Sequence, residues 1–194
     1  MPGFDGLFRH EILPFIGMLL GLVLAALLVD LGLHLADAVW VGRWLGIPGV
    51  LLILASSAYS ARKRKLISTG DPMVLLRWHE AAAWSGSLLV LVHAGIHFNA
   101  ILAWLAVAAM LVNVASGLTG KYLLKRARLR LDGTRKRLLA EGMATEAVRE
   151  RLHWDSLTVD ALKSWRVVHV PITLAFAVLA AGHLLAIALF WSWR

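Results

Sequence analysis

Residues 167–191 read VVHVPITLAFAVLAAGHLLAIALFW, an apolar run that holds two histidines and no Asp, Glu, Lys or Arg. A helix that crosses the hydrocarbon core of a bilayer needs about 20 consecutive, mainly apolar residues. Backbone N–H and C=O groups find no water partners in lipid, so such a run is expected to be helical throughout. The stretch therefore predicts a transmembrane helix that carries ionisable side chains.

Four further stretches of the chain are similarly long and apolar. Hydrophobic residues make up 59% of the 194 residues, and the mean hydropathy is +0.71, above the usual range for a soluble domain. We therefore predict an all-α integral membrane helical bundle that forms a single domain over residues 1–194. Its five transmembrane helices are expected at residues 13–35, 44–61, 74–97, 101–124 and 167–191.

The positive charges of the chain predict its orientation in the membrane. The formal net charge is +8, and the Lys and Arg residues gather in two links, residues 62–65 and 121–137. Short loops rich in Lys and Arg stay in the cytoplasm, so the N-terminus is expected inside and the C-terminus outside. We expect a bacterial cytoplasmic membrane as the location and membrane lipid as a partner. Basic clusters between apolar spans do not favour nucleic acid as a partner.

The longer basic link, residues 125–165, is predicted to be a cytoplasmic amphipathic segment. Asp132-Gly133 is a turn signal, and Thr145 is a suitable residue to cap a short helix. Two interpretations stay open for this link. It is either a surface helix that lies on the lipid headgroups or a docking platform for a soluble redox partner.

The chain contains no cysteine. This excludes disulfides, iron–sulfur ligation, thiolate chemistry and the covalent attachment of a c-type haem. A redox centre in this protein would have to be held by histidine or methionine.

Two pairs of histidines have the same spacing on two of the predicted spans. His79 and His93 are 14 residues apart, and so are His169 and His183. Fourteen residues is nearly four helical turns, so both members of a pair face one side, about 21 Å apart along the axis. Ionisable side chains inside a bilayer are costly and usually mark function. The third and fifth spans run in the same direction, so the four histidines offer two clamps at two depths.

Each clamp is suited to the two axial positions of a b-type haem, since neutral imidazole is a metal ligand. We expect an inner haem between His79 and His169 and an outer haem between His93 and His183. Halfway between the histidines of each pair lie Gly86, with room for a porphyrin edge, and Phe176, which could pack between the haems. Two arginines could bind the propionates of the inner haem or simply reach the headgroups: Arg77 and Arg166.

This arrangement resembles the di-haem four-helix core of cytochrome b from quinol-oxidising bc-type complexes. It is also similar to the ferric-reductase-like transmembrane family, in which the third and fifth spans supply the ligands. The segments that carry the resemblance are Arg77-Trp78-His79, His93-Ala94-Gly95-Ile96-His97, residues 116–122 and residues 165–171. The chain departs from these families in two ways. It has no Pro-Glu-Trp-Tyr quinol-oxidation motif, and it ends at Arg194 without a sixth helix that would lead to a flavin domain.

The predicted function is therefore that of a di-haem cytochrome b subunit of a larger membrane oxidoreductase complex rather than of an enzyme alone. It would carry electrons between a quinone pool, or another redox partner, and a partner subunit on the other face of the membrane. The alternative is a haem-free helical transporter or an assembly subunit. A quinone site is expected at the outer end, where three side chains could exchange protons with a quinone: Asp30, His34 and His97. His97 could also replace His93 as the outer ligand.

Overall fold

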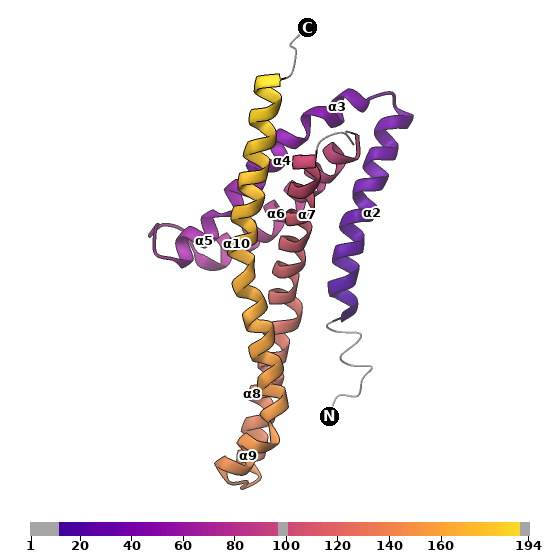
Figure 1. Cartoon of the computed structure of the whole chain (residues 1–194). Coiled ribbons are helices and arrows are strands. Elements are labelled where there is room, and N and C mark those ends of the chain that lie inside the picture. Colours follow the sequence, from indigo (N-terminus) through magenta and orange to yellow (C-terminus); the bar gives the residue numbers. More distant parts are fainter. Residues whose placement is uncertain (1–11, 97–100, 191–194) are drawn as a thin grey trace. The chain divides into compact units, whose positions relative to one another are not determined.

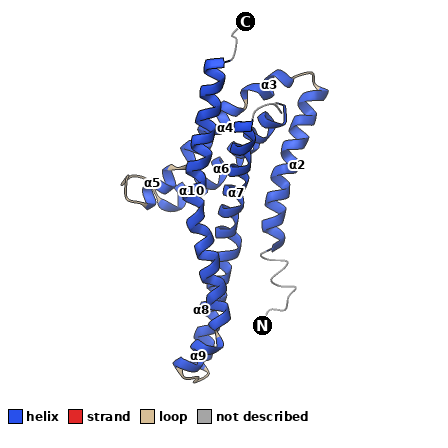
Figure 2. Cartoon of the chain, in the orientation of Figure 1, coloured by secondary structure: helices blue, strands red, loops and turns tan. Residues whose placement is uncertain are grey.

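All the regular secondary structure that the structure, a computed structural model, describes is helical, with short turns and loops between the helices (Figure 2). The described residues are 12–96 and 101–190, and they contain no strand. The all-α fold class is thus confirmed. Figure 1 shows the helices α2 (Leu13–Leu35), α3 (Val39–Trp44), α4 (Gly46–Ser56), α5 (Ala58–Lys63), α6 (Pro72–Ile96), α7 (Ile101–Leu118), the π-helical segment η2 (Thr119–Leu124), α8 (Lys125–Ala140), α9 (Thr145–Arg151) and α10 (His153–Phe190).

Four helical stretches within the described ranges are long and apolar enough to cross a membrane, which fits an integral membrane protein. They are Leu13–Leu35, Val39–Lys63, Ile101–Ala140 and His153–Phe190. The predicted third span corresponds to α6, a helix of 25 residues. It is not among the four, because Arg77, Glu80 and the two histidines lower its hydropathy.

The second span and a predicted turn differ from the structure. The second span begins at Val39 rather than Trp44 and is divided into α3, α4 and α5. Pro48 has no N–H to donate to the carbonyl of Trp44, which accounts for the break before α4. The turn predicted at Asp132-Gly133 is wrong, because both residues lie inside α8.

The fifth predicted span is the end of a much longer helix. α10 begins at His153, before the apolar run, so the second half of the predicted link is helical and continuous with the span. Thr145 begins α9, but its side chain does not cap that helix, whose N-cap residue is Ala144.

The chain divides into two compact units. Unit 1 comprises residues up to Leu19 and the segment Ala115–Ile172, and unit 2 comprises Leu20–Val114 and the segment from Thr173 onward. α8 and α9 belong to unit 1, where Leu138, Val148 and Leu152 form a small buried cluster. α6 belongs to unit 2, together with most of α2 and the segments α3 to α5.

The core of unit 2 is formed by α6, α7 and the final part of α10. Phe176 of α10 is 2% exposed and lies among small and aliphatic side chains of the three helices. A hydrogen-bonded pair also joins two of these helices, because the Asn113 amide donates to the Thr173 hydroxyl over 2.8 Å. Polar contacts of this kind link helices in lipid, where water does not compete for them. The buried residues of the core are Val90, Ala94, Ala106, Val107, Met110, Phe176 and Ala180.

The start of α6 is fixed by an aspartate and a proline. The Asp71 carboxylate accepts hydrogen bonds from the backbone N–H groups of Met73 and Val74, at 2.7 and 3.0 Å. Pro72 occupies the first helical position, where its missing N–H costs nothing. The register of α6, and with it the direction of its histidines, therefore begins from a defined cap.

Candidate functional site

The outer histidine pair, His93 of α6 and His183 of α10, comes together in unit 2. The two imidazole ring centres are 6.5 Å apart, and the ring planes make an angle of 61°. Both side chains are partly buried. Residues that are 90 positions apart in the sequence thus meet at one place, as the equal spacing of the histidines predicts.

The separation of the two rings suits a metal held between them. Two metal–imidazole bonds of about 2 Å each, with the distance from each nitrogen to its ring centre, add up to roughly 6 Å. Rotation about the two metal–nitrogen bonds leaves the angle between the ring planes open. The observed 6.5 Å between the ring centres would therefore allow the two imidazoles to hold one haem iron.

The tautomer of His93 is fixed by a backbone group. Its Nδ1 lies 3.3 Å from the carbonyl oxygen of Gly42 in α3. A carbonyl oxygen can only accept, so Nδ1 carries the proton and Nε2 carries the lone pair. A metal-binding histidine normally donates its other ring nitrogen to a carbonyl or carboxylate in this way.

Gly46 provides the space for the His93 ring. A Cβ atom at this position would lie 2.8 Å from Cδ2, 2.9 Å from Cγ and 3.0 Å from Nε2 of His93. Distances this short are not compatible with the present ring position. The edge of the ring that carries Nε2 therefore lies where only a glycine leaves room for it.

His79 is held in the same way near the other end of α6. Its Nδ1 donates to the carbonyl oxygen of Ser56, the last residue of α4, over 2.9 Å. The ring of Tyr59 lies beside it, with the ring centres 5.7 Å apart. As with His93, this hydrogen bond places the lone pair on Nε2. Both histidines of α6 thus have the tautomer that haem ligation requires.

The fourth predicted ligand, His169, belongs to unit 1. Its side chain is partly buried, and Cε1 would be 3.9 Å from a Cβ atom on Gly117 of α7. The adjacent residue, Ser116, is 2% exposed, and its hydroxyl has no hydrogen-bond partner among the described residues. His169 therefore lies against a small-residue surface beside an unsatisfied donor. Its pairing with His79 stays a prediction from the spacing.

The residues predicted to pack on the haems have varied surroundings. Gly86 was predicted to leave room for a porphyrin edge, but its neighbour is α4. A Cβ at Gly86 would lie 2.7 Å from the carbonyl oxygen of Gly49. This glycine allows α4 and α6 to approach closely. Phe176 is in the apolar core of unit 2. Arg77 is exposed at the start of α6, while the side chain of Arg166 lies outside the described part of the structure.

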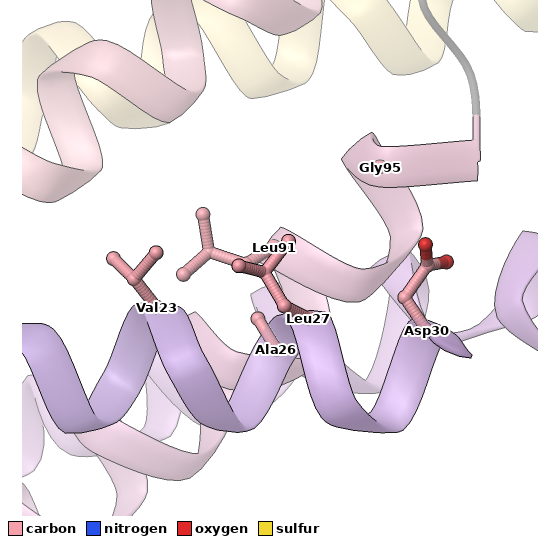
Figure 3. Close-up of a pocket in the computed structure, with 6 residues that line it drawn as sticks. All are labelled: Val23, Ala26, Leu27, Asp30, Leu91 and Gly95. Carbon is pink, nitrogen blue, oxygen red and sulfur yellow. The ribbon is translucent and has the colours of Figure 1, made fainter. Parts of the chain in front are cut away.

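Of the predicted quinone residues, Asp30 lines a pocket of about 120 Å³ between α2 and α6, shown in Figure 3. Asp30 of α2 faces Gly95 of α6, where a Cβ would be 3.7–3.8 Å from the carboxylate. The His34 ring donates from Nδ1 to the Asp30 carbonyl over 2.9 Å and lies 3.7 Å from its carboxylate. His97 is outside the described residues. The pocket is lined by Val23, Ala26, Leu27, Asp30, Leu91 and Gly95.

The residues that support the histidines of α6 were not predicted. Gly42 and Gly46 are separated by three residues, a pattern typical of close helix approach, and this signal could have indicated them. Nothing in the sequence pattern indicates the Ser56 carbonyl or the Tyr59 ring as neighbours of His79.

No protein-family model, curated protein or solved structure matches this chain. Within residues 12–96 and 101–190 there is no group of three or more His, Asp or Glu side chains that could hold a metal ion. A haem iron takes four ligands from the porphyrin and asks for only two from the protein. A histidine pair would therefore be enough to hold a haem iron.

Proposed function

We propose that this protein is a di-haem b-type cytochrome subunit that carries electrons across the membrane. The observation that carries the proposal is the outer histidine pair, with its ring centres 6.5 Å apart and the His93 tautomer set by the Gly42 carbonyl. The second, inner haem would be held by His79, whose tautomer is set by Ser56, and by His169. The two centres would lie about 21 Å apart along α6.

In this proposal α6 also crosses the membrane, as the third of five spans. Its 25 residues correspond to a length of about 38 Å, enough for the hydrocarbon core of a bilayer. Its polar residues are then explained by the haems, since His79 and His93 would face cofactors instead of lipid. With five spans and both basic links in the cytoplasm, the N-terminus is inside and the C-terminus outside.

A haem with two histidine ligands supplies reversible one-electron transfer and has no open position for oxygen or substrate. The chain's part is to hold the imidazoles, fix their protons on Nδ1 and keep water away from the pair. The apolar core around Phe176, next to the outer pair on α10, suits this exclusion. The protein would therefore relay electrons between a quinone pool or redox partner and a partner subunit on the other face of the membrane.

A haem-free helical transporter or assembly subunit is the competing function. Transporters for protons or cations usually pair intramembrane histidines with carboxylates. In the described part of the chain, the Nδ1 atoms of His79 and His93 donate to backbone carbonyls of α4 and α3, respectively. Metal-binding histidines commonly donate their other ring nitrogen to a carbonyl in this way, so these contacts support metal ligation.

The spectrum of the purified protein tests the proposal. A reduced-minus-oxidised difference spectrum, with a pyridine haemochrome assay for stoichiometry, is expected to give two low-spin b haems per chain. A protein that is monodisperse and helical by circular dichroism but colourless after expression with haem supplementation would disprove the proposal. Repeating the assay on His34→Ala, a histidine that is not a proposed ligand, controls for adventitious haem binding.

We further propose that the pocket between α2 and α6 is the quinone site of this relay. The Asp30 carboxylate faces the pocket and lies on the same helix face as His34, one turn away, so a quinone oxygen there could exchange protons with it. Leu91 and Gly95 each lie two residues from His93, so they project from roughly the opposite side of α6. A quinone ring bound there would lie at the depth of the outer haem, with α6 between them.

Replacement of Asp30 by asparagine is expected to slow the reduction of the haems by a quinol about a hundredfold, because a positioned acid or base contributes at least that much. Both haems should be retained, since Asp30 is not a ligand. Stopped-flow absorbance with a water-soluble quinol measures the rate, and dithionite reduction of the same sample measures the haem content. Gly17→Ala, in open space on the same helix, is the control. An unchanged rate in Asp30→Asn would exclude this pocket.

A further inference from the structure

α8 concentrates the positive charge of the protein. It contains seven Lys or Arg residues against one Asp, a formal charge of +6 in a chain whose total is +8. Leu138 is buried on one side of α8 against Val148 and Leu152. The rest of the helix surface is mainly basic. We call its exposed cations the basic face, and they are Lys125, Arg126, Arg128, Arg135, Lys136 and Arg137.

Much of the basic face lies away from the lipid, because α8 continues the apolar helix along its axis. Leu118, Leu124 and Lys125 all have helical angles, so the helix passes from α7 through η2 into α8 without a turn at which α8 could fold down. From Lys121, the first cation after the apolar run, to Ala140 the helix rises about 28 Å. A headgroup layer adds only about 6 Å on each side of the hydrocarbon core. The distal cations at 135–137 therefore lie well beyond the headgroups.

The beginning of α10 supports the same placement. Trp154 is 78% exposed, and it precedes the apolar run that starts at Val167 by 13 residues of unbroken helix, about 20 Å. At that distance the indole does not reach the lipid interface. Exposed tryptophan and arginine are the side chains that contribute most to protein–protein contacts. α9, which connects α8 to α10, has equal numbers of acidic and basic residues, so the net positive charge of α8 and α9 together comes from α8.

We infer that the distal part of the basic face, Arg135 to Arg137, together with Trp154, docks the acidic surface of a small soluble electron carrier. The inference rests on the proposed electron relay for the kind of partner, and on charge complementarity and helix length for the surface. Opposite charges steer such a partner and fix its orientation, while a buried aromatic side chain slows its release. Anionic lipid headgroups are the competing occupant, and they would contact the proximal cations instead.

A binding measurement separates these cases without using electron transfer. The protein is placed in nanodiscs of neutral lipid, and its affinity for an acidic [2Fe–2S] ferredoxin is measured by biolayer interferometry at low salt. Basic cytochrome c, of similar size and opposite charge, is the probe control. The distal variant Arg135→Gln/Lys136→Gln/Arg137→Gln and Trp154→Ala are each expected to weaken ferredoxin binding about tenfold. The matched proximal variant Lys125→Gln/Arg126→Gln/Arg128→Gln should have a clearly smaller effect.

The opposite ranking of the two triple variants, or no ferredoxin binding by the unmodified protein, would overturn the inference. The lipid alternative is tested directly with Lys136→Cys, which introduces the only cysteine of the chain for a fluorescent label. Quenching of that label by spin-labelled headgroups in anionic nanodiscs would place the distal face on the membrane and also overturn the inference. The haem content of each sample is measured in parallel, so a failure of docking and a failure of the haem proposal give different results.

Discussion

Replacement of His93 by alanine is expected to remove one of two haems and leave the other in place. In the proposed arrangement His93 and His183, whose ring centres are 6.5 Å apart, hold the same iron, so loss of either imidazole would leave that iron with a single protein ligand. His183→Ala should therefore abolish the same spectral component as His93→Ala, about half of the haem absorbance, while His79→Ala abolishes the other component. Low-temperature difference spectra and potentiometric titration distinguish the two haems.

The conservative variant His93→Met separates ligation from a structural role. Methionine can replace histidine as an axial ligand and raises the reduction potential of the haem. His93→Met is expected to retain the outer haem at a higher potential, which a histidine needed only for packing would not produce. Loss of different haems in His93→Ala and His183→Ala would contradict the pairing. His97 is the competing candidate for the outer ligand. Because the proposal assigns that role to His93, His97→Ala is expected to retain both haems.

The parts of the fold that the sequence predicts correctly are those dominated by uninterrupted apolar runs. Leu13–Leu35 was predicted as a span and is α2, with the same bounds, because its long apolar run contains one carboxylate and no proline after the first turn. The fourth span begins at the predicted Ile101, but its helix continues past the predicted end at Leu124 to Ala140. The boundaries that agree follow from length and hydropathy alone.

The predictions that are wrong concern segments without a long, uninterrupted apolar run. Pro48 and the hydroxyls of Ser56 and Ser57, which bond to carbonyls three residues back, divide the second span into short helices. Residues 153–166 carry charges of both signs, so hydropathy gives no sign that they continue α10. Gly133 inside α8 resembles a turn residue, but a single glycine costs a helix only about 1 kcal/mol.

In the candidate site, too, some features could be predicted from the sequence and others could not. Spacing alone predicts that His79 and His93 share one face of α6, and both bond to segments of α3 and α4 on that side. Spacing also predicts the meeting of His93 with His183. The supporting groups could not be predicted, because two of them are backbone carbonyls, which every residue possesses. Only the fold determines which carbonyl lies beside an imidazole.

Replacement of Gly46 by alanine is expected to weaken binding of the outer haem about tenfold, as changes to groups that orient metal-binding histidines commonly do. The new Cβ would lie within 3.0 Å of three atoms of the His93 ring, so the ring must move and its hydrogen bond to the Gly42 carbonyl must lengthen. Transfer of haem from the protein to apomyoglobin, followed by absorbance, measures the change. The inner haem, on the other half of α6, should transfer at its original rate.

Gly182→Ala is the matched control, because Gly182 precedes the other outer ligand on α10 and a Cβ there would meet nothing within 4 Å. It is expected to leave the transfer of both haems unchanged. Gly49→Ala provides a second comparison, since its Cβ would clash with the Gly86 carbonyl at 2.9 Å and strain the contact of α4 with α6 without touching a histidine. Equal haem loss in Gly46→Ala and Gly49→Ala would mean that helix packing, and not the position of the His93 ring, controls haem binding. Selective loss of the outer haem in Gly46→Ala alone would tie this glycine to the orientation of one imidazole.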